Sequence, residues 1–200
     1  EGGHVRIGSM TDSFVPALVA FDLDDTLAPS KSPMPAPMAQ ALRQLLDVVP
    51  VCIISGGQMG QFRSQVLGNL HANDAELAAL HLMPTCGTRY YTWDGSDWGL
   101  VYAHDLSDAQ RDAALEAVER EAKRLGLWES QTWGDILEDR GSQITFSALG
   151  QEAPLEAKKA WDPTGEKKNT LREAVAAYLP ELEVRSGCST SVDITLKGVD

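Results

Sequence analysis

The sequence has few of the features that mark secreted, membrane-spanning or nucleic-acid-binding proteins. Its three cysteines, Cys52, Cys86 and Cys188, are far apart and odd in number, which argues against a disulfide framework and against a zinc site. No apolar run approaches the roughly 18 residues that a membrane span needs. The N-terminus lacks the basic-then-apolar pattern of a signal peptide. These absences predict a cytoplasmic protein with reduced thiols and no membrane partner.

Basic residues are also scarce. The 200 residues include 17 Lys and Arg against 29 Asp and Glu, a net charge of −12. This balance argues against a nucleic-acid or anionic-membrane partner, because both require clustered Lys and Arg. An anionic substrate would therefore need local cations or a metal ion for its recruitment. With 43% hydrophobic residues, the chain has the composition of an ordinary globular protein.

The first part of the chain alternates strand and helix patterns. Residues 1–10 are expected to be a leader or a cloning remnant. Within residues 11–87 the apolar spacing predicts strands and helices in turn: strand 18–23, a helix over 37–49, strand 49–54, a helix over 60–70 and a weaker strand near 80–87. This order predicts an α/β fold with a Rossmann-like parallel sheet and helices on both faces.

The pattern changes after Gly87. Asp94-Gly95 predicts a hairpin turn, and the segment from Ser107 to Gly126 predicts a long helix with an N-terminal capping box. A second amphipathic helix follows over residues 166–180, and alternating strands are predicted over 142–149 and 190–197. Residues 88–196 therefore read as an α+β cap with an antiparallel sheet, inserted after the parallel one. Residues 197–200 return to the first unit, whose remaining part is absent.

The string FDLDDTL carries the clearest chemical signal. Asp22 and Asp24 lie two residues apart after an apolar strand, so both side chains share one strand face. At the carboxyl end of a strand in an open α/β sheet, that face overlooks the ligand crevice. Two carboxylates there suit Mg²⁺, which prefers oxygen ligands and pairs with phosphate. The alternative, acids that only end the strand, fits an isolated D-x-D pair better than it fits this whole string.

FDLDDTL resembles the first motif of the haloacid dehalogenase superfamily, D-x-D-x-T-[LV]. The resemblance implies that Asp22 attacks phosphorus to form an aspartyl-phosphate, that Asp24 transfers protons, and that both belong to the Mg²⁺ site. Thr26 matches the hydroxyl residue of the motif and is expected to contact phosphate. Asp25 replaces a Gly common in the sugar-phosphate branches and receives no catalytic role.

Ser55 and Gly56 follow the second predicted strand. A Ser hydroxyl and the next free amides form a neutral phosphate cradle, although S-G-G is also a common strand-to-helix turn. The resemblance favours the cradle, because the second motif of the superfamily is a Ser or Thr at this place.

Longer segments resemble subfamily IIB of the superfamily, the phosphomannomutase-like and sugar-phosphate phosphatase branch. They are SGGQMGQFRSQVLGNL, CGTRYYTWDG, EDRGSQITFSALGQ and STSVDITLKGVD. The resemblance implies that Arg140 binds a distal phosphate and that Ser191 and Asp193 bind the sugar. A surface ion pair with Glu138 or Asp139 is the alternative for Arg140.

The sequence also departs from that branch. Gln151 replaces a second cap arginine, and Lys158 and Lys159 stand near a third, where lysine keeps the charge but loses the bidentate fork. The third-motif Lys and fourth-motif acid would fall beyond Asp200, and Lys197 lies four positions too early. These departures favour a fragment of a longer protein, with the first strand left at a sheet edge.

The sequence predicts a Mg²⁺-dependent phosphohydrolase that acts on a phosphorylated sugar or similar small metabolite through an aspartyl-phosphate. Two alternatives remain: a phosphomannomutase-like sugar phosphomutase, and a catalytically incomplete fragment or non-catalytic binding module. The expected partner is a small phosphorylated metabolite, with a homodimer formed through the cap.

Overall fold

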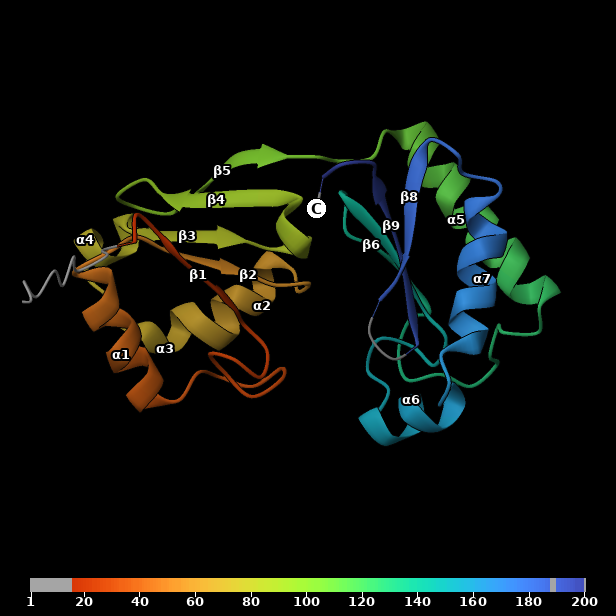
Figure 1. The fold of residues 1–200 in the computed structure, drawn as a ribbon, viewed down its shortest axis with the longest axis horizontal. Coiled ribbons are helices and arrows are strands. Elements are labelled where there is room, and N and C mark those ends of the chain that lie inside the picture. The colour runs from red at the N-terminus through yellow and green to blue at the C-terminus, as the bar shows by residue number, and fades with distance from the viewer. Residues whose placement is uncertain (1–15, 188–189, 200) are drawn as a thin grey trace, which may run out of the picture.

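The computed structural model describes residues 16–187 and 190–199, which form two units (Figure 1). The first unit has a five-stranded sheet in the order β1-β2-β3-β4-β5. Its strands are β1 (Val19–Asp22), β2 (Val51–Ile54), β3 (Leu80–Met83), β4 (Arg89–Trp93) and β5 (Trp98–Ala103). Because β1, β2 and β3 pair in parallel, their carboxyl ends meet at one edge of the sheet.

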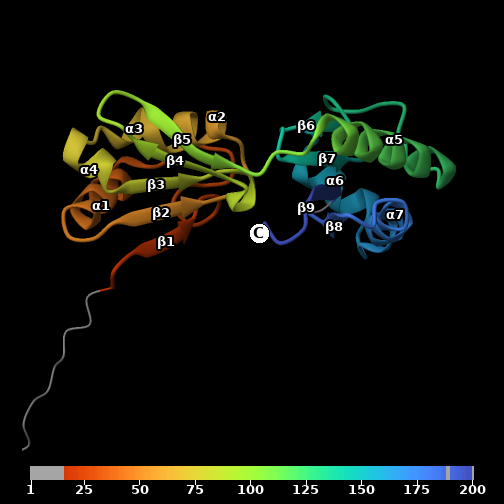
Figure 2. The same cartoon turned by 90° about the horizontal axis from the view of Figure 1, so that it is seen from above.

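Two crossover connections cover the same face of this sheet. The helices of the first unit are α1 (Ala36–Leu46), α2 (Met59–Phe62), the π-turn η1 (Arg63–Leu67), α3 (Gly68–Leu70) and α4 (Asp74–Ala78). Right-handed connections that run in one direction across a sheet place their helices on one side. Figures 1 and 2 show α1 and α3 on the same side, so the expected cover on both faces is wrong for the described residues.

The predicted hairpin is present, and it belongs to the first sheet. Gly95 occupies the turn at φ 101°, and β4 pairs antiparallel with β3 as well as with β5. The sequence-based boundary at residue 88 groups this hairpin with the cap, because its alternating pattern resembles that of the later strands. Pairing across the sheet, which local pattern does not encode, joins it to β3.

The second unit has an antiparallel sheet in the order β6-β7-β9-β8. Its elements are α5 (Asp108–Arg124), β6 (Leu137–Asp139), β7 (Gln143–Ser147), α6 (Leu155–Trp161), α7 (Glu166–Ala176), β8 (Leu182–Ser186) and β9 (Ser191–Leu196). The 3₁₀ turn η2 (Thr85–Gly87) belongs to the first unit, where it links β3 to β4. The whole is an α/β fold with a mixed, partly parallel sheet and a second antiparallel one.

Alternation gives the second sheet one apolar face and one polar face. Ile144 and Phe146 on β7 and Ile194 on β9 pack in the core with α5 and α7. Gln143 and Asp193 point to the opposite face and line a cavity that also touches the first unit. A strand with period two therefore supplies one face to the core and the other to the wall of a cavity.

Several local signals are confirmed. Ser107 accepts a hydrogen bond from Gln110 N while the Gln110 side chain accepts from Ser107 N, the predicted capping box, and Gly126 follows the helix at φ 71°. Strand β1 lies at the edge of the described sheet, as expected.

No helix among the described residues is long and apolar enough to cross a membrane.

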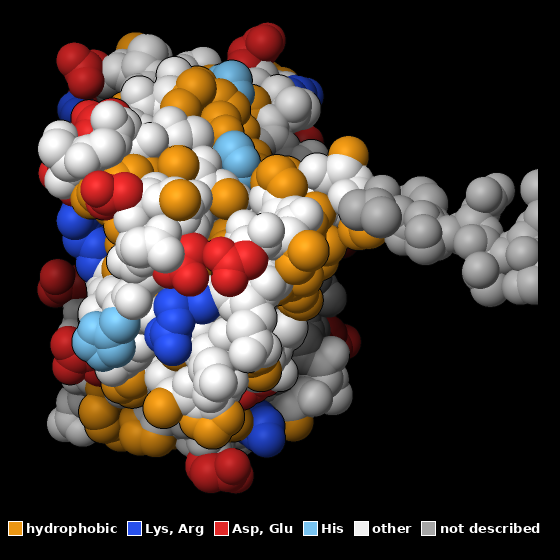
Figure 3. All heavy atoms as spheres, turned by 90° about the vertical axis from the view of Figure 1, so that its left-hand side faces the viewer, with side chains coloured by type: hydrophobic (Ala, Val, Ile, Leu, Met, Phe, Trp, Pro, Cys, Tyr) orange, Lys and Arg blue, Asp and Glu red, His pale blue; other side chains and the backbone are white. Residues whose placement is uncertain are grey.

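Figure 3 shows the end of the first unit that faces away from the second. Among the described side chains drawn there, Lys and Arg are scattered between Asp and Glu.

Candidate active site

The parallel register brings Asp22 and Ser55 to neighbouring positions. Asp22 pairs with Ile54, so Ser55 begins the turn directly beside it at the carboxyl edge of the sheet. Ser55 is 5% exposed, and its hydroxyl oxygen accepts a hydrogen bond from Gly57 N at 3.3 Å. The hydroxyl proton of Ser55 is therefore left to donate to a ligand. Asp22 is exposed, and one of its oxygens accepts from Leu23 N at 2.7 Å.

The acidic motif continues into a tight turn. Asp25 has a left-handed backbone at φ 59°, and its amide donates to Ala28 O at 2.7 Å. The Asp25 carboxylate accepts from Ser30 N at 3.0 Å, a contact that stabilises the turn and fits the absence of a catalytic assignment. Thr26 is exposed in the same turn, with its amide 3.3 Å from Leu23 O.

Asp24 is held by groups that the sequence analysis did not identify. Its Oδ2 accepts from Gln61 Nε2 at 3.2 Å, and its Oδ1 accepts from Gln65 Nε2 at 3.1 Å and from Lys31 N at 3.1 Å. The two glutamines lie four residues apart beside the buried Phe62 and Val66. The sequence signal that could have found them is the i, i+4 spacing of the two glutamines, which places both on one side of the predicted helix after Ser55.

The acidic edge partly fits a hard divalent cation. Asp22 offers an exposed carboxylate, as a Mg²⁺ ion shared with a substrate phosphate requires. Both oxygens of Asp24 accept from N–H groups, so its side chain offers less to a metal in this arrangement. Within the described residues there is no group of three or more His, Cys, Asp and Glu side chains that could hold a metal ion. Asp22 would be the residue to hold such an ion, because its carboxylate is exposed.

A strained segment after β3 braces the Ser55 turn. Thr85 and Cys86 have left-handed backbones at φ 49° and 55°, and the Cys86 amide donates to Ser55 O at 2.9 Å. The Thr88 hydroxyl donates to Thr85 O at 2.7 Å and lies 2.8 Å from the hydroxyl of Ser142 in the second unit. These buried hydroxyls join the two units beside the candidate site.

Arg140 reaches from the second unit to the same turn. Its Nη1 donates to Gly56 O at 2.8 Å, while Nε and Nη2 donate to Glu138 at 3.1 and 2.7 Å. The ion pair with Glu138 that the sequence left open is present. Arg140 lies at the junction of the two units, with its guanidinium engaged by protein groups.

Ser191 and Asp193 share one face of β9, as their spacing predicts. A Cβ placed on Gly187 would lie 2.3 Å from Ser191 Oγ and 2.5 Å from Asp193 Oδ2, so both side chains pack against that glycine. Asp193 Oδ1 accepts from the Thr145 hydroxyl at 2.8 Å. Burial raises the pKa of Asp193, an effect that the Thr145 hydrogen bond and the Arg140 charge oppose.

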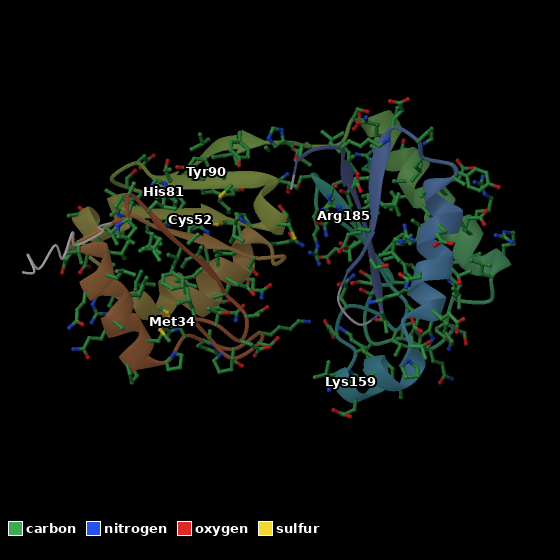
Figure 4. All side chains as sticks on the ribbon, viewed as in Figure 1. Met34, Cys52, His81, Tyr90, Lys159 and Arg185 are labelled. Carbon is green, nitrogen blue, oxygen red and sulfur yellow. The ribbon has the colours of Figure 1, made fainter. Side chains whose placement is uncertain are left out.

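A cavity of about 440 Å³ lies between the units. Its walls comprise Gly56 and Cys86 from the first unit and Gln143, Arg185, Ser186, Gly187, Asp193 and Thr195 from the second. Figure 4 shows Arg185 on the side of the second unit that faces the first. Gly56 thus belongs to both the Ser55 turn and this cavity, whereas Asp22, Asp24 and Ser191 are not among its lining residues.

Of the remaining cap residues, Gln151 and Lys158 lie at another contact between the units, whereas Lys159 and Lys197 contact residues of the second unit. Lys31 Nζ and Lys158 Nζ approach Gln151 O at 3.4 and 3.5 Å. Lys159 is exposed and lies 4.0 Å from Glu156. Lys197 donates to Pro180 O, a contact within the second unit.

Comparison with solved structures identifies the fold. The C-terminal domain of C. albicans trehalose-6-phosphate phosphatase matches with a TM-score of 0.62 and 15% identity, covering 92% of this chain and 58% of that one. Plasmodium falciparum IMP-nucleotidase matches with a TM-score of 0.61 and 11% identity, covering 90% and 52%. Its mutant with bound IMP matches with a TM-score of 0.54 and 12% identity, covering 90% and 50%.

The chain thus spans somewhat more than half the length of the first two structures. No protein-family model and no curated protein matches the sequence. At this low identity the similarity describes the fold alone: the chain has an α/β fold with a second antiparallel sheet, like that of these solved structures.

Proposed function

We propose that this chain is part of a Mg²⁺-dependent phosphohydrolase that acts on a small phosphorylated metabolite through an aspartyl-phosphate. The observation that carries the proposal is the convergence of Asp22, Asp24 and Ser55 at the carboxyl ends of two adjacent parallel strands. This is the edge at which ligands bind in open α/β sheets.

In the proposed reaction an Asp22 oxygen attacks phosphorus, and the bond from phosphorus to the leaving oxygen breaks. Asp24 donates a proton to that oxygen. Asp24 then takes a proton from a water molecule whose oxygen attacks the aspartyl-phosphate, which releases inorganic phosphate and restores Asp22. The Ser55 hydroxyl and the neighbouring amides of the turn would donate hydrogen bonds to the phosphoryl oxygens.

Mg²⁺ would supply positive charge that offsets the repulsion between Asp22 and the phosphoryl group. Asp22 would hold it, together with substrate oxygens and water. Thr26 is proposed to contact phosphate from the adjoining turn.

The second unit is proposed to select the substrate. Asp193 and Ser191 offer acceptors to the hydroxyl groups of a sugar or a similar polyol, and Arg140 would leave Glu138 to contact a distal anionic group. Gln151, in place of a second arginine, weakens the grip on a second phosphate that a phosphomutase needs. This substitution favours hydrolysis over the mutase alternative. A cytoplasmic location and a homodimer through the second unit are further proposals, the latter tested by light scattering.

The test is phosphate release from a panel of sugar phosphates and nucleotides, with and without Mg²⁺, by the wild type and Asp22→Asn. We expect Mg²⁺-dependent release by the wild type and a loss of at least about a thousandfold in the variant, because the nucleophile is removed. Asp25→Asn is the matched control and should keep most of the activity. Full activity in Asp22→Asn would contradict the proposal, and no release by the wild type would favour the non-catalytic alternative.

A further inference from the structure

We propose that Gln61 and Gln65 are positioning residues that clamp the carboxylate of Asp24 for proton transfer. The inference rests on the proposed function, in which Asp24 is the acid and base. Both glutamines lie within the segment SGGQMGQFRSQVLGNL, but the sequence analysis gave neither a role.

The two amides bind different oxygens of one carboxylate. Gln61 Nε2 lies 3.2 Å from Asp24 Oδ2, and Gln65 Nε2 lies 3.1 Å from Asp24 Oδ1. A single donor leaves a carboxylate free to rotate about its terminal bond, whereas donors on both oxygens fix its plane. The backbone amide of Lys31, 3.1 Å from Oδ1, completes the set.

The burial of Gln65 argues against a role in packing alone. Its side chain is 2% exposed, and its Nε2 also donates to Ser32 O at 2.8 Å. Because both partners of Nε2 are acceptors, the orientation of the amide is determined. Its Oε1 is buried without a partner among the described residues, an unfavourable state that an apolar residue would avoid. The unfavourable burial of Oε1 accompanies the two hydrogen bonds that Gln65 Nε2 donates, to Asp24 and to Ser32.

Gln61 connects the clamp to the Ser55 turn. A Cβ on Gly57 would lie 2.1 Å from Gln61 Oε1, so the Gln61 side chain lies across this glycine. Gly57 N in turn donates to Ser55 Oγ. A side chain at position 57 would displace Gln61, and the same turn therefore supports both the candidate phosphate cradle and Asp24.

The helix between these groups is irregular where the clamp forms. The π-turn η1 (Arg63–Leu67) interrupts the run from α2 to α3, and it contains Gln65. Such turns are frequent at functional sites, because the extra residue changes which side chains share a face. Here Val66 stays in the core while Gln65 reaches Asp24.

Two measurements test the clamp. The first is phosphate release by Gln61→Met and Gln65→Met, which keep side-chain length but remove the donors. Each should lower kcat about tenfold or more with KM changed less than about twofold, as expected for lost hydrogen bonds to a charged group. Arg63→Met, an exposed residue on the same helical run whose guanidinium pairs with Asp97, is the control and should keep wild-type rates. Thermal unfolding verifies that each variant is folded.

The second measurement does not depend on activity. In ¹⁵N-labelled protein, Asp24→Ala should shift the side-chain amide signals of both Gln61 and Gln65. Asp25→Asn should leave them in place, because Asn keeps an acceptor for Ser30 N and tolerates the left-handed backbone of position 25.

Any one of three results would overturn the clamp. They are an unchanged kcat in both Met variants, an effect confined to KM, and side-chain amide signals of Gln61 and Gln65 that do not shift in Asp24→Ala. If the wild type releases no phosphate from any substrate, the proposed function fails, and the amide signals alone decide whether the glutamines hold Asp24.

Discussion

The two units differ in the residue types that occupy left-handed backbone positions. In the described chain, every non-glycine residue with positive φ lies in the first unit: Asp25, Lys31, His71, Thr85 and Cys86. In the second unit these positions are all glycines: Gly126, Gly134, Gly141, Gly150, Gly165 and Gly198. A left-handed non-glycine residue costs roughly 1–2 kcal/mol, which glycine avoids.

The costly positions concentrate beside the candidate site. Asp25 and Lys31 lie in the turn after β1, and Thr85 and Cys86 follow β3. Hydrogen bonds to the Ser55 turn and to the loop after Asp22 hold them in place. Strain that persists under such restraint is typical of functional sites. To the candidate site, the second unit contributes mainly its antiparallel sheet and the polar face of that sheet.

The largest expected effect tests whether the units are separately stabilised. Phe146→Ala removes a fully buried ring from the core of the second unit and should cost about 3–5 kcal/mol. In Phe146→Ala, the rate of backbone amide hydrogen exchange should rise in β7, β9 and α7, whereas the amides of the first sheet should stay protected. Phe62→Ala, in the core of the first unit, is the reciprocal control. Equal loss of protection in both units after either change would show that they unfold as one.

A smaller effect separates two kinds of left-handed glycine. A Cβ on Gly150 would lie 2.2 Å from Trp133 O, whereas a Cβ on Gly126 would meet open space. We expect Gly126→Ala to cost about 1 kcal/mol for the backbone alone, and Gly150→Ala at least about 2 kcal/mol because the clash is added. Urea unfolding measures both. An equal loss of unfolding free energy in the two variants would mean that the loop with Trp133 moves away from the new Cβ at position 150 without a cost in stability.

The smallest effect compares two carboxylates with opposite pKa shifts. Burial raises the pKa of Asp193, so folding favours its neutral form and its charge lowers stability at neutral pH. Asp193→Asn should therefore melt above the wild type at pH 7, and this difference should vanish at about pH 3, below the ordinary Asp range.

Asp94 in the hairpin is the contrasting case. Backbone hydrogen bonds from Asp97 and Ser96 lower its pKa, so its stabilising contribution is present at neutral pH and is lost on acidification through that pKa. Asp94→Ala should melt below the wild type at pH 7 and approach it in acid. A difference in melting temperature between the wild type and Asp193→Asn, or between the wild type and Asp94→Ala, that stays constant at all pH values would contradict the environment assigned to that carboxylate.

Local sequence information predicted much of this molecule. The apolar strand before Asp22, the capping box of α5 and the hairpin turn at Gly95 are confirmed. The alternation of β7 and β9 is confirmed as well, because period two directly determines which side chains share a face. Strands β6 and β8 and the helices α4 and α6 were not predicted, since each is short. In β8 the alternation is present but rests on only two apolar residues, Leu182 and Val184.

The sequence by itself determined the order of elements, the pair of acids at a strand end and the two faces of the later strands, because these depend on neighbours within a few residues. Only the tertiary structure decided that the hairpin joins β3, that Gln61 and Gln65 meet Asp24, and that Arg140 reaches Gly56. Each of these contacts joins residues from separate elements. Their geometry follows from how the sheets and the π-turn pack, which no local pattern specifies.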